Sequence, residues 1–198
     1  MNLEGRKIAA ILCERRWAVK LCLVRVECPR KSMSKADQGR AEFPRLQKIL
    51  LPTDFSGCAG YALPYAAQIA RATKATIICV HVVEPVVPAV GYTGLAEPMP
   101  IADISEQLED SAGRQLPKVA ECEECAGLEV EEVIVHGDAA AEIVRVAEER
   151  EVDLIVISSH GRTGLGRMIF GSTAEAVVRH AACPVLVVKP PAQEEDAN

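Results

Sequence analysis

Five short apolar runs, separated by longer stretches, constrain the fold of this chain more than any other feature. They cover residues 46–54, 75–83, 128–137, 153–158 and 183–190. Short runs rich in Val and Ile are typical of strands that are buried on both faces of a sheet. Strands that alternate with helices require a parallel sheet with right-handed crossovers. We therefore predict an α/β fold with an open five-stranded parallel sheet and helices on both faces.

The stretches between these runs predict helices. Ser56 is placed to cap the first helix, and Asp138 is placed to cap an amphipathic one. The helix expected over residues 101–127 contains Pro117, which we expect to break or kink it. Prolines exclude regular structure from residues 84–100, and loops of this length are usually functional or mobile.

Charge divides the chain into three parts. Residues 1–45 hold 11 of the 22 Lys and Arg but only 5 of the 28 Asp and Glu, so the remainder is acidic. We expect residues 1–44 to be a basic extension that is flexible, or one whose residues 1–32 lie upstream of a true start at Met33. Residues 45–190 should form the domain, and residues 191–198 an acidic tail. An acidic body argues against nucleic acid as a partner.

Neither a membrane span nor a secretory signal stands out in the sequence. No stretch approaches the roughly 20 apolar residues that a membrane-spanning helix needs, and no convincing signal-peptide pattern is present. Eight cysteines without such a signal indicate a reducing compartment rather than a disulfide framework. We therefore expect a cytoplasmic protein with no membrane partner.

Cys122 and Cys125 form a Cys-x-x-Cys motif inside an acidic helical stretch. The neighbouring glutamates should raise the pKa of these thiols, which is the reverse of a redox-active site. No second Cys or His pair follows at zinc-finger spacing. We therefore expect neither a redox role nor a metal site here, and the sequence does not assign another role to the pair.

Three histidines, His81, His136 and His160, fall at the carboxyl ends of predicted strands or just beyond them. No Ser-His-Asp arrangement accompanies them. We expect such a histidine to orient a loop by a hydrogen bond rather than to act as a general base.

The glycine-rich stretch Ser158–Thr173 follows the fourth apolar run and leads into a helical segment. Glycines allow backbone N–H groups to approach phosphate oxygens, and a helix N-terminus adds about half a positive charge. The stretch is a candidate phosphate-binding loop. The alternative is a flexible surface loop that ends in an ordinary Ser cap.

Two well-known phosphate motifs do not fit the chain. The dinucleotide fingerprint needs G-x-G-x-x-G after the first strand, where the sequence has LPTDFSGCAG. The Walker loop has its glycine spacing at Gly161 and Gly166, but Arg167 and Met168 replace the Lys and Ser or Thr. A P-loop nucleoside triphosphatase is therefore disfavoured.

Several motifs together resemble the universal stress protein family. They are LPTDFS after the first run, VHV in the second, HGD before the third helix, and DLIVISSHGRTGLGRMIFGSTAEAVVRHAACPVLVVKP. The resemblance covers residues 47–189 and implies a Rossmann-like fold that binds adenine nucleotides. The family's ATP signature is Gly, two residues, Gly, nine residues, Gly, then Ser or Thr. Here Gly161, Gly171 and Ser172 match it, and Ser158 replaces the first glycine.

The resemblance implies ATP as the cofactor, with Mg²⁺ as a companion ion. Asp54 would accept hydrogen bonds from base or ribose, and Val82 would meet adenine through its main chain. Without the resemblance, Asp54 could equally cap a helix, Val82 could be core, and Arg162 could be solvated. The implied cofactor site is Pro52, Thr53, Asp54, Val82, Ile157, Ser158, Gly161, Arg162, Gly171, Ser172 and Thr173.

The resemblance predicts an ATP-binding stress-response or regulatory protein without dedicated catalysis. Slow ATP hydrolysis or autophosphorylation stays open, because the site would hold phosphates and hydroxyls but no evident base. The alternative is a nucleotide-independent interaction protein of the same fold. An adenylating enzyme is more distant, because its Ser-Gly-Gly-type loop is absent after the first strand.

The last apolar run also suggests an assembly. Val185–Val188 would be the final strand of the sheet and would leave an edge open for pairing. The family resemblance implies a homodimer through this strand, in which a two-fold axis buries both edges. Other protein partners are not identified by the sequence.

Overall fold

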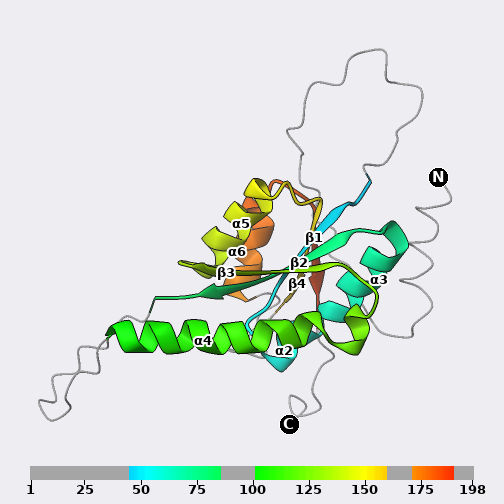
Figure 1. Ribbon diagram of the computed structural model, residues 1–198. Coiled ribbons are helices and arrows are strands. Elements are labelled where there is room, and N and C mark those ends of the chain that lie inside the picture. The colour runs from blue at the N-terminus through cyan, green and yellow to red at the C-terminus, as the bar shows by residue number, and fades with distance from the viewer. Residues whose placement is uncertain (1–44, 86–100, 160–170, 190–198) are drawn as a thin grey trace, which may run out of the picture.

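The computed structural model describes residues 45–85, 101–159 and 171–189, with the side chains of residues 101–104 excepted. Within these ranges a five-stranded parallel sheet has the order β3-β2-β1-β4-β5 (Figure 1). The predicted open parallel sheet is therefore confirmed. Its strands are β1 (Lys48–Pro52), β2 (Thr76–Val83), β3 (Val130–His136), β4 (Leu154–Ser158) and β5 (Val185–Val188).

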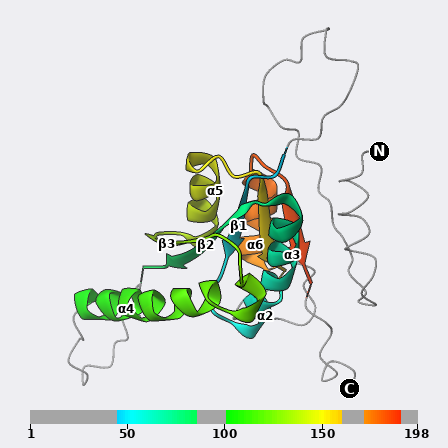
Figure 2. The same ribbon diagram turned by 45° about the vertical axis from the view of Figure 1, so that its right-hand side comes forward.

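Helices cover both faces of the sheet, as predicted (Figure 2). Apolar residues of α5 (Ala139–Glu149) and α6 (Ser172–His180) pack on one face. Those of α3 (Leu63–Thr73) and α4 (Ile101–Ala120) pack on the other. Because side chains alternate along a strand, Leu50 belongs to the first cluster and Leu51 to the second.

The first predicted helix is in fact two helices. Ser56 caps α2 (Gly57–Gly60) as expected, since its Oγ accepts a hydrogen bond from the N–H of Ala59 at 3.1 Å. The chain then turns before α3 begins at Leu63. Pro64 explains the interruption, because it has no N–H to donate to a preceding carbonyl.

Of the break or kink predicted at Pro117, the break is wrong, because α4 continues through this residue to Ala120. The N–H of Glu121 still donates to the Pro117 carbonyl at 2.8 Å. Leu116 beside it is 1% exposed, so tertiary packing holds this turn in place. A short 3-10 helix, η1 (Glu123–Cys125), follows.

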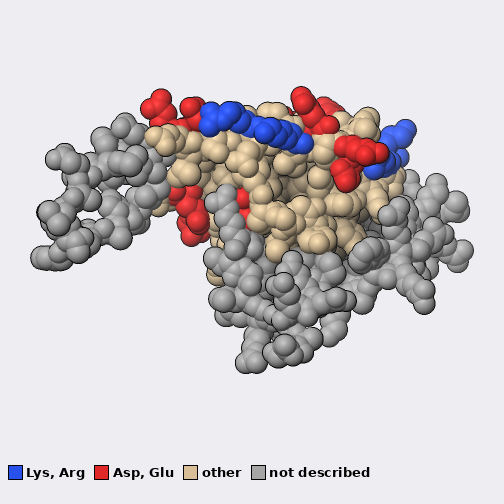
Figure 3. Space-filling view, turned by 90° about the horizontal axis from the view of Figure 1, so that it is seen from below, with Lys and Arg blue, Asp and Glu red and all other residues tan. Residues whose placement is uncertain are grey.

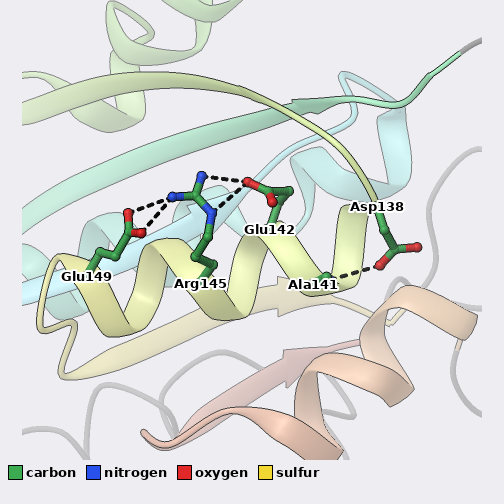
Figure 4. Close-up of polar contacts among 5 residues, drawn as sticks. All are labelled: Asp138, Ala141, Glu142, Arg145 and Glu149. Atoms are coloured by element: carbon green, nitrogen blue, oxygen red, sulfur yellow. Dashed lines mark hydrogen bonds and ion pairs between the residues drawn. The ribbon is translucent and has the colours of Figure 1, made fainter.

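Helix α5 shows how local polar contacts fix a helix (Figure 4). Asp138 Oδ1 accepts from the N–H of Ala141 at 2.9 Å, so the predicted N-cap is confirmed. Arg145 bridges Glu142, at 2.6 Å, and Glu149, at 2.7 Å, on the exposed side. These bonds raise the pKa of the Arg145 guanidinium above its usual range.

The central strand β1 is paired on both sides, with β2 along its whole length and with β4 at Ile49 and Leu50. Asp153 strengthens the second pairing, because its Oδ2 accepts from the N–H of Gln47 at 2.8 Å and of Lys48 at 3.1 Å. The order of the strands reverses at β1. In open α/β sheets, ligands bind beyond the carboxyl ends of the strands at such a switch point.

Candidate functional site

A cavity of about 470 Å³ lies at the carboxyl ends of the strands, where the order reverses. The loop after β1, the ends of β2 and β4, the start of α6 and one side of α4 line it. Its walls are Pro52–Phe55, Ala59, Val80–Glu84, Leu108, Ser111, Ala112, Gln115, Ala139, Ile143, Ile157–Ser159 and Gly171–Ala174.

The loop after β1 is tied down by its own side chains. Thr53 Oγ1 accepts from the N–H of Phe55 at 3.1 Å, and Asp54 Oδ1 accepts from the N–H of Ser56 at 3.0 Å. Phe55 has a φ of 62°, a left-handed conformation that a bulky residue adopts only where its surroundings hold it. We call residues Thr53–Ser56 the β1 wall.

His81 holds the β1 wall from the neighbouring strand. Its Nδ1 lies 2.8 Å from the carbonyl oxygen of Thr53, so the ring donates its Nδ1 proton there. The ring also lies against Phe55, with centroids 4.3 Å apart and planes tilted by 30°. His81 therefore orients this loop, which is the role expected for it. His136 instead faces Glu109 at 3.4 Å on the surface, and His160 lies outside the described residues.

A second wall joins the end of β4 to the start of α6. The N–H of Gly171 donates to the carbonyl of Ser159 at 2.7 Å, which brings these two elements together. Gly171 is the N-cap of α6, and no side chain caps the helix. The N–H groups of the first turn therefore present partial positive charge near the cavity. We call Ser158, Ser159 and Gly171–Thr173 the β4–α6 wall.

The charged side chains among the described lining residues are Asp54 and Glu84, and both are acidic. On the face seen in Figure 3, acidic and basic side chains lie mainly along the upper rim, above an uncharged middle. An anion in the cavity would therefore depend on the start of α6 for its favourable electrostatics.

Comparison with known proteins identifies the family. The family model for universal stress proteins matches residues 45–189. The chain belongs to the universal stress protein family. It is 38% identical over 148 residues to the universal stress protein MJ0531 of Methanocaldococcus jannaschii, which covers 75% of this chain and 85% of the relative. It is 32% identical over 146 residues to the universal stress protein YxiE of Bacillus subtilis, covering 72% of this chain and 98% of the relative.

Solved structures of the family share the fold. The structure of the protein MJ0577 aligns with a TM-score of 0.64 at 31% identity, over 76% of this chain and 100% of that one. UspA of Lactobacillus plantarum aligns with a TM-score of 0.56 at 26% identity, over 74% of this chain and 99% of that one. Within the described residues, no helix is both long and apolar enough to cross a membrane.

The structure brings most of the predicted site residues together around the cavity. Nine of them line it, and Gly161 and Arg162 lie outside the described residues. The nine are Pro52, Thr53, Asp54, Val82, Ile157, Ser158, Gly171, Ser172 and Thr173. Their contact with a ligand stays a prediction.

The side of the cavity formed by α4 was not predicted. Leu108, Ser111, Ala112 and Gln115 line it, and Gln115 Nε2 donates to Ser111 Oγ at 3.0 Å. Their spacing of three to four residues places them on one side of a helix, which is the signal that could have identified them. The sequence does not say which part of that side faces a sheet and which part faces a cavity.

The Cys-x-x-Cys motif lies away from the cavity. Cys122 is the N-cap of η1, and Cys125 is buried. Burial, more than the hydrogen bond to Cys122 or the charge of Glu124, raises the pKa of Cys125 to about 12. Burial likewise raises the pKa of Cys79 to about 12. Among the described residues, no His, Cys, Asp and Glu side chains gather into a metal-binding group.

Proposed function

We propose that this universal stress protein binds ATP in the cavity at the switch point of its sheet. The supporting observation is that the uncapped start of α6 and the tied loop after β1 line the same cavity. A helix start without a side-chain cap suits phosphate oxygens. A rigid loop with a carboxylate suits the hydroxyl and amino groups of a nucleoside.

Four of the predicted residues have specific roles in this proposal. Asp54 accepts hydrogen bonds from the base or the ribose through its carboxylate oxygens. Val82 contacts adenine through its main-chain groups. Ser172 and Thr173 offer hydroxyl and N–H groups to the phosphates. Because Asp54 and Glu84 are both acidic, we expect Mg²⁺ to accompany ATP and to reduce the repulsion.

The proposal includes no dedicated catalysis. A general base must lie within hydrogen-bonding reach of the proton that it removes. The Nδ1 atom of His81 is engaged with the Thr53 carbonyl at 2.8 Å, so that nitrogen serves structure. Slow hydrolysis or autophosphorylation remains compatible with a site of this composition. We place the activity in the cytoplasm, in a regulatory or stress-response role.

We also propose a homodimer that forms through β5. Val185–Val188 is an edge strand of the sheet, and its side chains are already buried on both faces within this chain. The outer backbone groups of the strand are then what a second copy would pair with. Because Val185→Lys would disrupt the core, the better test is concentration-dependent hydrogen exchange of the Val187 amide together with light scattering.

The ATP proposal is tested by Gly171→Glu, with Gly171→Ala as the matched control. The φ of Gly171 is −71°, which either side chain can adopt. A carboxylate at the start of α6 should repel phosphates and lower ATP affinity at least tenfold in calorimetry, whereas Ala should change it little. The purified protein should also release nucleotide when it is denatured. No released nucleotide and no heat signal would favour the nucleotide-independent interaction protein.

A further inference from the structure

Ser158 carries a hydroxyl group that the described part of the fold does not use. The residue is 6% exposed, and its Oγ is buried without a hydrogen-bond partner among the described residues. Buried hydroxyl groups in native proteins nearly always have a partner, because leaving one unpaired is costly. Ser158 also lines the cavity. An unpaired hydroxyl in this place points to a partner that arrives with the ligand.

The direction of the side chain limits what that partner can be. Ser158 is in register with Val188, and Val156 precedes it by two residues. Both valines pack in the cluster under α3, on the face opposite α6. Register partners and residues two apart share a face of a sheet, so the Ser158 hydroxyl lies on that face too.

The cavity extends around the carboxyl ends of the strands, so that residues from both faces of the sheet line it. Ala59 of α2 lines it on one face, and Ala174 of α6 lines it on the other. A phosphate held at the start of α6 would lie on one face of the sheet, whereas the Ser158 hydroxyl lies on the other. The partner of this hydroxyl is then a part of the ligand beyond its phosphates.

We propose that Ser158 is a specificity residue whose hydroxyl group pairs with a sugar hydroxyl of the bound nucleotide. The inference rests on the proposed ATP site and adds that the site selects ribonucleotides over deoxyribonucleotides. A glycine at this position would supply no side-chain partner. A neutral sugar hydroxyl is a suitable match because, like the hydroxyl of Ser158, it has one donor proton and two acceptor lone pairs.

The binding test is a thermodynamic double-mutant cycle, in which the Ser158 hydroxyl is removed from the protein and a sugar hydroxyl is removed from the ligand. Affinities of ATP, 2′-deoxy-ATP and 3′-deoxy-ATP are measured by calorimetry for the wild type, Ser158→Ala and Ser158→Gly. The wild type should prefer ATP over one deoxynucleotide by about fivefold more than Ser158→Ala does, as expected for one neutral hydrogen bond. Equal preference in both proteins overturns the inference.

A stability measurement without ligand supplies a second readout. Ser158→Ala removes an unpaired hydroxyl, so its melting temperature should rise by about 2–4 °C. Ser56→Ala is the matched control, because the hydroxyl of Ser56 has a partner in Ala59, and its melting temperature should fall. A fall for Ser158→Ala as well would show that the hydroxyl already has a partner, which overturns the inference.

Two further outcomes distinguish a failure of the Ser158–sugar hydrogen bond from a failure of ATP binding itself. If Ser158→Gly binds ATP more tightly than the wild type, the side chain obstructs the sugar and the inference is wrong while ATP binding stands. If none of the three proteins binds any of the nucleotides, the proposed function fails and the inference fails with it.

Discussion

The two walls of the cavity differ in how their polar groups are used. In the β1 wall, Thr53, Asp54 and Ser56 each accept a hydrogen bond from a nearby backbone N–H, and His81 holds the Thr53 carbonyl. In the β4–α6 wall, Ser158 Oγ has no partner among the described residues, and α6 begins without a side-chain cap. Polar groups that are satisfied internally contribute to the fold, whereas open ones are available to a ligand. Substitutions in the β1 wall should therefore lower stability first, and substitutions in the β4–α6 wall should lower affinity first.

The largest expected effect in this comparison is that of His81→Ala. The change removes the hydrogen bond to Thr53 and the contact with Phe55, so the free energy of unfolding should fall by about 2 kcal/mol. Urea denaturation measures it. His136→Ala is the control, because that ring is exposed and makes a surface contact with Glu109, and its effect should stay below about 0.5 kcal/mol. Equal losses of unfolding free energy in the two variants would show that the contacts of His81 with the β1 wall do not stabilise the fold.

Asp54 tests whether one residue in the β1 wall serves both fold and ligand. Asp54→Ala removes the acceptor for the Ser56 N–H and should lower the free energy of unfolding by about 1 kcal/mol. Asp54→Asn keeps an oxygen acceptor and should change stability little, while it removes the charge that the ligand would meet. Chemical denaturation and ATP titration of both variants separate the two roles. A stability loss in Asp54→Asn as large as in Asp54→Ala would show that the charge matters to the fold.

The smallest stability effect is expected for Ser172→Ala in the β4–α6 wall. No side chain caps α6, so losing this hydroxyl should change the free energy of unfolding by less than about 0.5 kcal/mol. The affinity for ATP should still fall by about fivefold, the effect of one lost hydrogen bond. Thermal unfolding with and without ATP measures both quantities. A large loss of stability without ligand would show that the Ser172 hydroxyl already has a hydrogen-bond partner within the protein.

Much of the fold was predictable because its signals are local. The strands could be recognised from their β-branched runs, and the caps at Ser56 and Asp138 from residue type and position. The errors concern prolines, whose effect depends on context. Pro64 separates α2 from α3, whereas Pro117 remains inside α4, where the buried Leu116 holds the turn.

The candidate site was predictable only in part, for a different reason. Loops at the carboxyl ends of strands could be inferred from the topology, and they brought Asp54 and Thr173 to one cavity. The contribution of α4 could not be inferred, because it depends on how that helix packs against β2 and β3. The unpaired state of the Ser158 hydroxyl could not be predicted from the sequence either, because its possible hydrogen-bond partners are distant in the chain and are defined only by the folded structure.

The pairing of β1 with β4 has a consequence for biosynthesis. The central strand needs Leu154 and Ile155 as partners and Asp153 as an anchor, all made more than 100 residues after it. A ribosome that adds about 5–20 residues per second needs roughly 5–20 seconds to cover that distance. During this interval one edge of β1 has no partner strand from its own chain. The nascent chain is therefore more exposed to edge-to-edge aggregation before residue 155 emerges.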